Sequence, residues 1–64
     1  MLRLTVANEG LQEEFGHFYS THIPKVGDKL TIDSLELLPV TSREFVVEDN
    51  ELIEIILYTD KIAG

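Results

Sequence analysis

Few side chains in this chain could do chemistry. Its two imidazoles are His17 and His22, with the hydroxyl of Ser20 and the carboxylate of Asp28 nearby in the sequence. The odd spacing sends the two histidines to opposite faces of a regular strand, so they could share a metal ion only if the strand bulged near Gly16. Ser20, His22 and Asp28 can be written as a catalytic triad, but no nucleophile elbow surrounds the serine. Neither pattern predicts a catalytic or metal site.

Other catalytic patterns are equally weak. Carboxylates are paired at Glu13 with Glu14 and at Asp33 with Glu36, but no pocket can be argued around either pair. The four glycines are isolated, so there is no phosphate-binding loop, and the absence of cysteine excludes a disulfide or a thiolate metal site. We therefore expect a non-enzymatic protein without a cofactor. A hydrolase or metal enzyme is the alternative, and it would depend on one of the two histidines.

The last hairpin is the most informative segment. Residues 44–60 contain six acidic residues and no basic residue, among β-branched and aromatic side chains that favour strands. Alternation along the two strands predicts one shared apolar face, made by Arg43, Phe45, Val47, Ile53, Ile55 and Leu57.

The alternation of side chains also predicts how many residues the hairpin loop contains. A two-residue loop at Asp49 and Asn50 would not bring the two apolar sets together, whereas a three-residue loop at 48–50 would. Asn50 would take the left-handed conformation that such a loop needs. We therefore expect Val47 to face Glu51 and Phe45 to face Ile53.

The opposite face of the hairpin is the candidate protein-binding site. It alternates apolar side chains with carboxylates, and consists of Glu44, Val46, Glu48, Leu52, Glu54, Ile56 and Tyr58. One interpretation is that Val46, Ile56 and Tyr58 are covered by another part of the chain. The other is a docking surface, because an apolar centre with an acidic rim suits a basic partner.

Length and charge limit the class of function. Sixty-four residues form one domain, 1–64, which buries only about 60% of its unfolded surface and leaves little room for a small-molecule substrate. The net charge is −7, and residues 33–64 hold eight acids against two bases. This disfavours direct binding to nucleic acid or to an anionic membrane, and favours a basic protein or a second copy as partner. The start of the chain lacks the apolar stretch of a signal peptide, so we expect a cytoplasmic protein.

Turn signals divide the chain into five expected strands. These are residues 2–7, 11–23, 29–33, 40–47 and 52–59, with a turn at 26–28 and a frayed tail at 60–64. Gly16 suggests a bulge in the second strand, where a short helix over 11–18 is the alternative. The expected core contains Leu4, Val6, Phe15, Leu30, Ile32, Phe45, Ile53, Ile55 and Leu57, with Phe18, Tyr19 and Tyr58 partly at the surface.

These strands predict an all-β fold, a small five-stranded antiparallel sheet curled into an SH3-like, partly open barrel. Residues 23–30 (IPKVGDKL), residues 40–45 (VTSREF) and the ending Ile56-Leu57-Tyr58 resemble small uncharacterised bacterial and phage β proteins with an Ile-Pro-x-Val-Gly-Asp turn. The resemblance covers about the last two thirds of the chain and implies an architecture without an activity. Residues 35–39 depart from it, because a compact turn containing glycine would be expected there.

Two functions fit these features. The first is a protein-interaction module, a regulator or accessory subunit, that docks its last hairpin on a basic protein or on a second copy. The alternative is a phage-type acidic inhibitor that mimics the charge of nucleic acid and blocks a nucleic-acid-binding protein. Salt separates them, because a charge mimic loses binding steeply as ionic strength rises.

Overall fold

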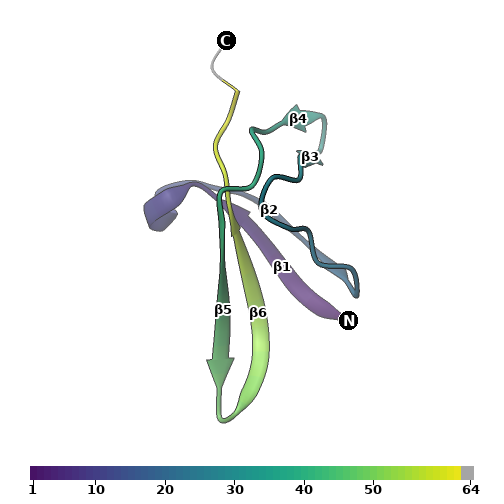
Figure 1. Ribbon diagram of the computed structural model, residues 1–64, viewed down its shortest axis with the longest axis vertical. Helices are drawn as coiled ribbons and strands as arrows, with labels where there is room; N and C mark the ends of the chain where they lie inside the picture. The colour runs from purple at the N-terminus through teal and green to yellow at the C-terminus, as the bar shows by residue number, and fades with distance from the viewer. Residues whose placement is uncertain (63–64) are drawn as a thin grey trace.

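The computed structural model describes residues 1–62, and it confirms a fold built mostly of β-strands (Figure 1). One short 3-10 turn, η1 (Glu9–Leu11), follows the first strand. The strands are β1 (Leu2–Ala7), β2 (Glu14–Ser20), β3 (Thr31–Ile32), β4 (Leu35–Glu36), β5 (Ser42–Glu48) and β6 (Glu51–Tyr58).

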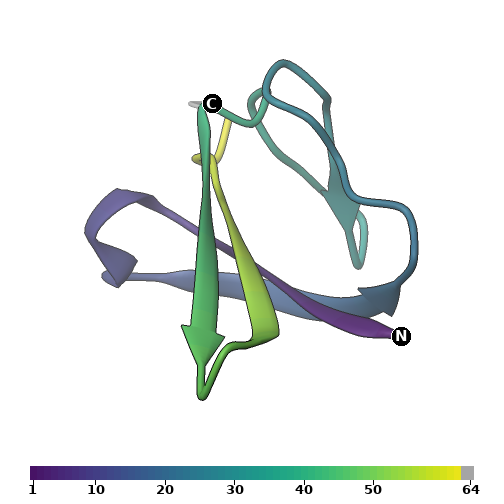
Figure 2. The same cartoon turned by 60° about the horizontal axis from the view of Figure 1, so that its bottom comes forward.

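The main sheet has the strand order β2-β1-β6-β5. The pairs β1–β2 and β5–β6 are antiparallel, but β1 and β6 run parallel. The expectation of one antiparallel sheet of five strands is therefore wrong. A parallel pair needs a long crossover, and here the chain between β2 and β6 supplies it. That crossover includes β3 and β4, which pair only with each other, so the strands do not close a barrel (Figure 2).

The second strand is bulged where the sequence predicted. Val6 lies opposite Gly16 while Ala7 lies opposite Glu14, so Phe15 is the extra residue. Gly16 has φ +154°, and a Cβ on it would lie 3.0 Å from a methyl carbon of Ile32. A glycine at this position therefore leaves room for the Ile32 side chain of β3 to pack against β2.

Two connections tie the ends of β5 and β6 to the body. The predicted turn at 26–28 is present: Gly27 has φ +98°, and Gly27 N donates to Val40 O at 2.8 Å, ahead of β5. After β6, Leu38 N donates to Asp60 O at 2.8 Å, and Lys61 pairs with Leu37. The expectation of a frayed tail is therefore wrong at residues 60 and 61, while residues 63 and 64 lie outside the described residues.

The core lies between one face of the main sheet and the segment that carries β3 and β4. Its fully buried cluster is Leu4, Val6, Leu37, Val40, Ile55 and Leu57, with Phe15, Leu30 and Ile32 partly buried against it. Two residues expected inside are exposed, Phe45 by 49% and Ile53 by 41%. Phe45 lies opposite Ile55 in the middle of the β5–β6 hairpin, and Ile53 lies nearer its turn. The hairpin extends along the long axis of the molecule (Figure 1).

Candidate protein-binding hairpin

The hairpin closes on a two-residue turn. Asp49 and Asn50 have φ of +50° and +64°, and Glu48 lies opposite Glu51. Positive φ at both central residues is the pattern of a type I′ turn, whose twist matches that of the flanking strands. The three-residue loop expected at 48–50 is therefore wrong.

A bulge in β6 compensates for the even number of residues in this turn, so that the two apolar sets still share a face. Val47 lies opposite Leu52 and Val46 lies opposite Glu54, so Ile53 has no partner of its own in β5. Closer to the body, Phe45 lies opposite Ile55 rather than Ile53. One extra residue therefore reconciles the short turn with the buried face of β6.

The bulge also divides the predicted binding site. Glu44 lies opposite Ile56 and Val46 opposite Glu54, so these residues share one face as expected, together with Tyr58. Leu52, opposite Val47, lies on the other face. Glu48 stays on the predicted face by alternation along β5. The seven predicted residues therefore do not form one continuous surface.

The centre of the predicted face is covered within the chain. Ile56 lies between Thr5 of β1 and Glu44 of β5, and it is only 7% exposed. The Tyr58 hydroxyl donates to Glu44 Oε1 at 2.6 Å. This hydrogen bond, with smaller effects of burial and of the Glu44 charge, raises the pKa of Tyr58. Ile56 is therefore not a docking contact, while Val46 and Tyr58 are half-buried.

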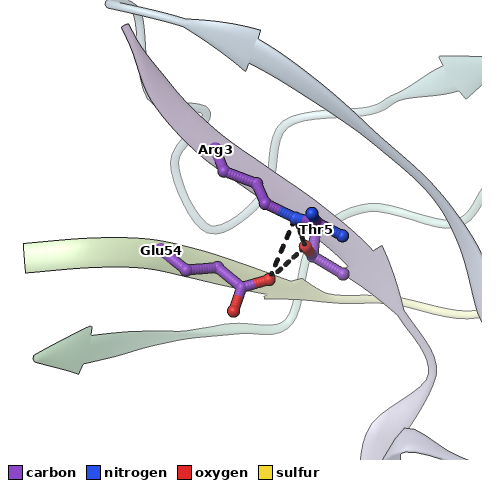
Figure 3. A network of polar contacts seen from close by, with 3 residues as sticks. All are labelled: Arg3, Thr5 and Glu54. Atoms are coloured by element: carbon purple, nitrogen blue, oxygen red, sulfur yellow. Dashed lines mark hydrogen bonds and ion pairs between the residues drawn. The ribbon is translucent and has the colours of Figure 1, made fainter. Parts of the chain in front are cut away.

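Glu54 forms a hydrogen bond and an ion pair with side chains outside the hairpin. The Thr5 hydroxyl donates to Glu54 Oε2, and Arg3 Nε lies 3.6 Å from the same oxygen (Figure 3). Both partners come from β1, which the parallel pairing brings beside β6. Sequence reasoning missed them because it looked for bases within the hairpin. Among residues 1–62 the other ion pair is Lys61 with Glu13, so the turn carboxylates take part in none.

The far half of the hairpin exposes apolar side chains on both strands. Ile53 lies there with Val47, 58% exposed, and Leu52, 39% exposed, and Phe45, opposite Ile55, adjoins them toward the body. The Arg43 guanidinium lies 5.5 Å from the centre of the Phe45 ring. We call these four apolar residues, with the carboxylates Glu48, Asp49 and Glu51 around the turn, the tip surface; Glu48 and Glu51 lie on the face opposite to Phe45, Val47 and Leu52.

The candidate catalytic side chains are not assembled into a site. His17 is exposed on β2, with its ring edge-on to Tyr19 at 5.9 Å between centres. Ser20 Oγ accepts a hydrogen bond from the backbone N of His22, and Asp28 Oδ2 accepts one from the backbone N of Lys25. The hydroxyl and the carboxylate of the supposed triad are thus occupied in local turns. No cluster of three or more possible metal ligands occurs in the part of the chain that the structure describes.

An open groove of about 420 Å³ lies where the sheet does not close. It is lined by Gly16–Phe18 of β2 and by residues 30–33 around β3. Sequence reasoning argued for no pocket around the carboxylate pair Asp33 and Glu36, of which Asp33 lines this groove. The polar side chains that line the groove are His17, Thr31 and Asp33.

No protein-family model, curated protein or solved structure matches the chain. Across residues 1–62, no helix has both the length and the apolar character needed to cross a membrane.

Proposed function

We propose that this chain is a small, non-enzymatic protein-interaction module, a regulator or accessory subunit, that docks its tip surface on a basic protein. The observation that carries the proposal is the exposure of four large apolar side chains next to three carboxylates that take part in no ion pair among residues 1–62. A patch of this kind at the end of a projecting hairpin costs solubility and folding stability unless a partner covers it.

The energetics favour a partner with both apolar and basic features. Burying exposed apolar surface contributes about 25 cal/mol per Å², so the apolar side chains of the tip would supply most of the binding free energy. Glu48, Asp49 and Glu51 surround the turn and would select a cationic rim on the partner. The proposed surface therefore keeps Glu48 and Leu52 of the predicted site, but excludes Ile56, which is buried, and Glu54, which pairs with Arg3.

One observation favours charge mimicry as a second candidate. Glu48 lies directly opposite Glu51, and like charges at such positions destabilise a hairpin. Keeping both carboxylates there, next to Asp49, concentrates negative charge as a phosphate backbone does.

The cytoplasmic location, the bacterial or phage resemblance and the SH3-like curling of the sheet stay predictions.

The two functions can be separated with three immobilised baits and one control bait exposed to bacterial lysate. These are the wild-type chain, a V47S/L52S variant and an E48Q/D49N/E51Q variant, and V26S is the control because Val26 is exposed away from the tip. Each retained protein is purified and its Kd measured at low and high salt. Apolar docking predicts that V47S/L52S weakens binding at least tenfold, about 1.4 kcal/mol, with little effect of salt.

Charge mimicry predicts the reverse pattern. The amide variant would lose binding, and added salt would weaken the wild-type complex steeply. Proteins retained equally by the wild type, both tip variants and V26S would overturn both candidates, because neither feature of the tip would then matter for binding.

A further inference from the structure

The outer edge of β5 is one of the two unpaired edges of the main sheet in the described residues. The strand order places β2 and β5 at the two edges of the main sheet. Both edge strands have seven residues, but β2 (Glu14–Ser20) carries a bulge at Phe15, whereas β5 (Ser42–Glu48) carries none. An edge strand leaves alternate N–H and C=O groups without partners, and lysine, proline or a bulge usually protects it. The β5 sequence SREFVVE has no lysine or proline, and the bulge of this hairpin lies in β6.

We propose that two copies of the chain pair through β5, antiparallel and about a two-fold axis at Phe45, so that their main sheets become one. This inference rests on the proposed function, because it names the second copy as the first partner of the same hairpin. It does not compete with a basic partner, since pairing along an edge leaves the faces of the joined sheet open.

The geometry of an antiparallel ladder restricts the choice of register. Residues directly opposite each other either both direct their N–H and C=O groups toward the other strand or both direct them away. Opposed residues in two copies of one strand therefore differ by an even number, and the two-fold axis has to pass through a residue of the strand. An axis at Phe45 is the one that pairs all seven residues of β5. Ser42 then lies opposite Glu48 of the second copy, Arg43 opposite Val47, and Glu44 opposite Val46.

Charge selects the same register. An axis at Glu44 would place two copies of that carboxylate opposite each other, and an axis at Val46 would place Glu44 opposite Glu48. Directly opposed like charges destabilise a strand pair. With the axis at Phe45, no carboxylate in the strand lies directly opposite another. The glutamates are then diagonal neighbours, whose weaker repulsion salt would screen.

The resulting dimer would enlarge the docking surface. The two Phe45 rings meet across the axis on one face, and Val47 of each copy lies opposite Arg43 of the other. In the single chain, the Arg43 guanidinium already lies 5.5 Å from the Phe45 ring centre, a distance suited to a cation–π contact. Two tip surfaces would thus present one continuous apolar patch with acidic ends.

Light scattering on the full chain tests the dimer over a range of concentrations at low and high salt. We expect a mass that rises toward twice that of one chain, more readily at high salt. F45E should weaken the dimer at least tenfold, because two carboxylates would meet on the axis. I53E is the matched control: it also adds a carboxylate at an exposed tip position, but on β6, away from the paired edge. Circular dichroism establishes that both variants are folded.

Crosslinking tests the register independently. The chain has no cysteine, so S42C and E48C each carry a single thiol. With the axis at Phe45, a mixture of the two variants should form a disulfide-linked dimer on mild oxidation, while neither variant alone should do so. Opposed residues in a ladder have Cα atoms about 4.5–5.5 Å apart, within the range of a disulfide.

A monomer at every concentration, an F45E variant that dimerises like wild type, or S42C crosslinking to itself would overturn the inference. The proposed function fails separately, through I53E and V47S/L52S. If those variants keep the basic partner of a chain that still dimerises, docking at the tip is wrong and the dimer stands.

Discussion

The two halves of the β5–β6 hairpin have similar residues and opposite environments. In the half next to the body, Ile55 and Leu57 are fully buried and Ile56 is nearly so. In the far half, Ile53 and Leu52 are about two-fifths exposed, although they belong to the same strand. Apolar composition alone therefore does not determine which part of a strand joins the core.

The difference comes from the neighbour of β6. Strand β1 pairs with β6 from Glu54 to Tyr58 and no further toward the turn. Where β1 is present, β6 is a central strand with the core on one face and side-chain contacts on the other, as is usual beside a parallel partner. Beyond Glu54 the hairpin has only its own two strands, which are marginally stable alone.

The largest expected effect compares two isoleucines of β6. Ile55→Ala should lower the free energy of unfolding by about 2–5 kcal/mol, because it leaves a cavity in the core. Ile53→Ala should lower it by roughly 1 kcal/mol or less, because this side chain is already 41% exposed. Urea denaturation of both variants measures the difference. Equal losses would mean that the tip is packed in solution as tightly as the core.

The second prediction concerns polar contacts of the half next to the body. Thr5 is only 4% exposed and its hydroxyl donates to Glu54. A double-mutant cycle with Thr5→Val and Glu54→Ala should give a coupling free energy of about 1 kcal/mol. The exposed pair Lys61–Glu13, 2.9 Å apart, is the control and should give roughly 0.5 kcal/mol or less. A larger coupling in the control pair would contradict the importance given to burial.

The third prediction tests the bulge by deleting Ile53. A deletion within a strand normally turns the following side chains to the other face. Here the extra residue would be lost while Val47 stays opposite Leu52 and Val46 stays opposite Glu54, so the free energy of unfolding should change by about 1 kcal/mol or less. Cross-strand nuclear Overhauser effects in the deletion variant should retain both pairs. Contacts between Val47 and Glu51 would instead indicate the three-residue loop.

The bulge also explains how far the sequence could predict this hairpin. Alternation correctly put Arg43 and Leu57 on one face and Glu44 and Ile56 on the other, but the expected register would have paired Arg43 with Ile55 rather than Leu57. The parity argument then excluded the turn that forms, because it assumed strands without insertions. Asn50, expected with positive φ, was a correct signal for the turn. Nothing in the pattern showed that Ile53 would be the extra residue.

Long-range pairing was the second limit. The strand at residues 2–7 was expected, but its parallel alignment with β6 was not, because period-two alternation carries no information about a strand's neighbours. This pairing buries Ile56 and gives Glu54 its partner Arg3, and so removes two residues from the predicted binding face. Leu37 and Val40 were likewise missed as core residues, because residues 35–39 were expected outside the strands and Val40 only at the start of one, rather than in a segment that covers the sheet.

The smallest expected effect is the pH dependence of Tyr58. Its pKa is raised because the neutral hydroxyl donates to Glu44, and the phenolate would lose that bond. The folded chain thus holds this proton more tightly than the unfolded chain, whose tyrosine has a pKa of about 10. The resulting stability is fully present below that pH and is lost as pH rises through the folded pKa. Absorbance of the phenolate reports the titration of Tyr58 alone in a Tyr19→Phe background.

In that background, Glu44→Gln should lower the pKa of Tyr58 toward its ordinary value, since the charge and the strongest acceptor are both lost. Glu48→Gln is the matched control on the same strand, and should leave the titration of Tyr58 almost unchanged because Glu48 lies at the turn. If the control lowers the pKa of Tyr58 as much as Glu44→Gln does, the pKa depends on the summed negative charge of both halves of the hairpin rather than on the hydrogen bond to Glu44. The contrast between the halves would then hold for packing but not for charge.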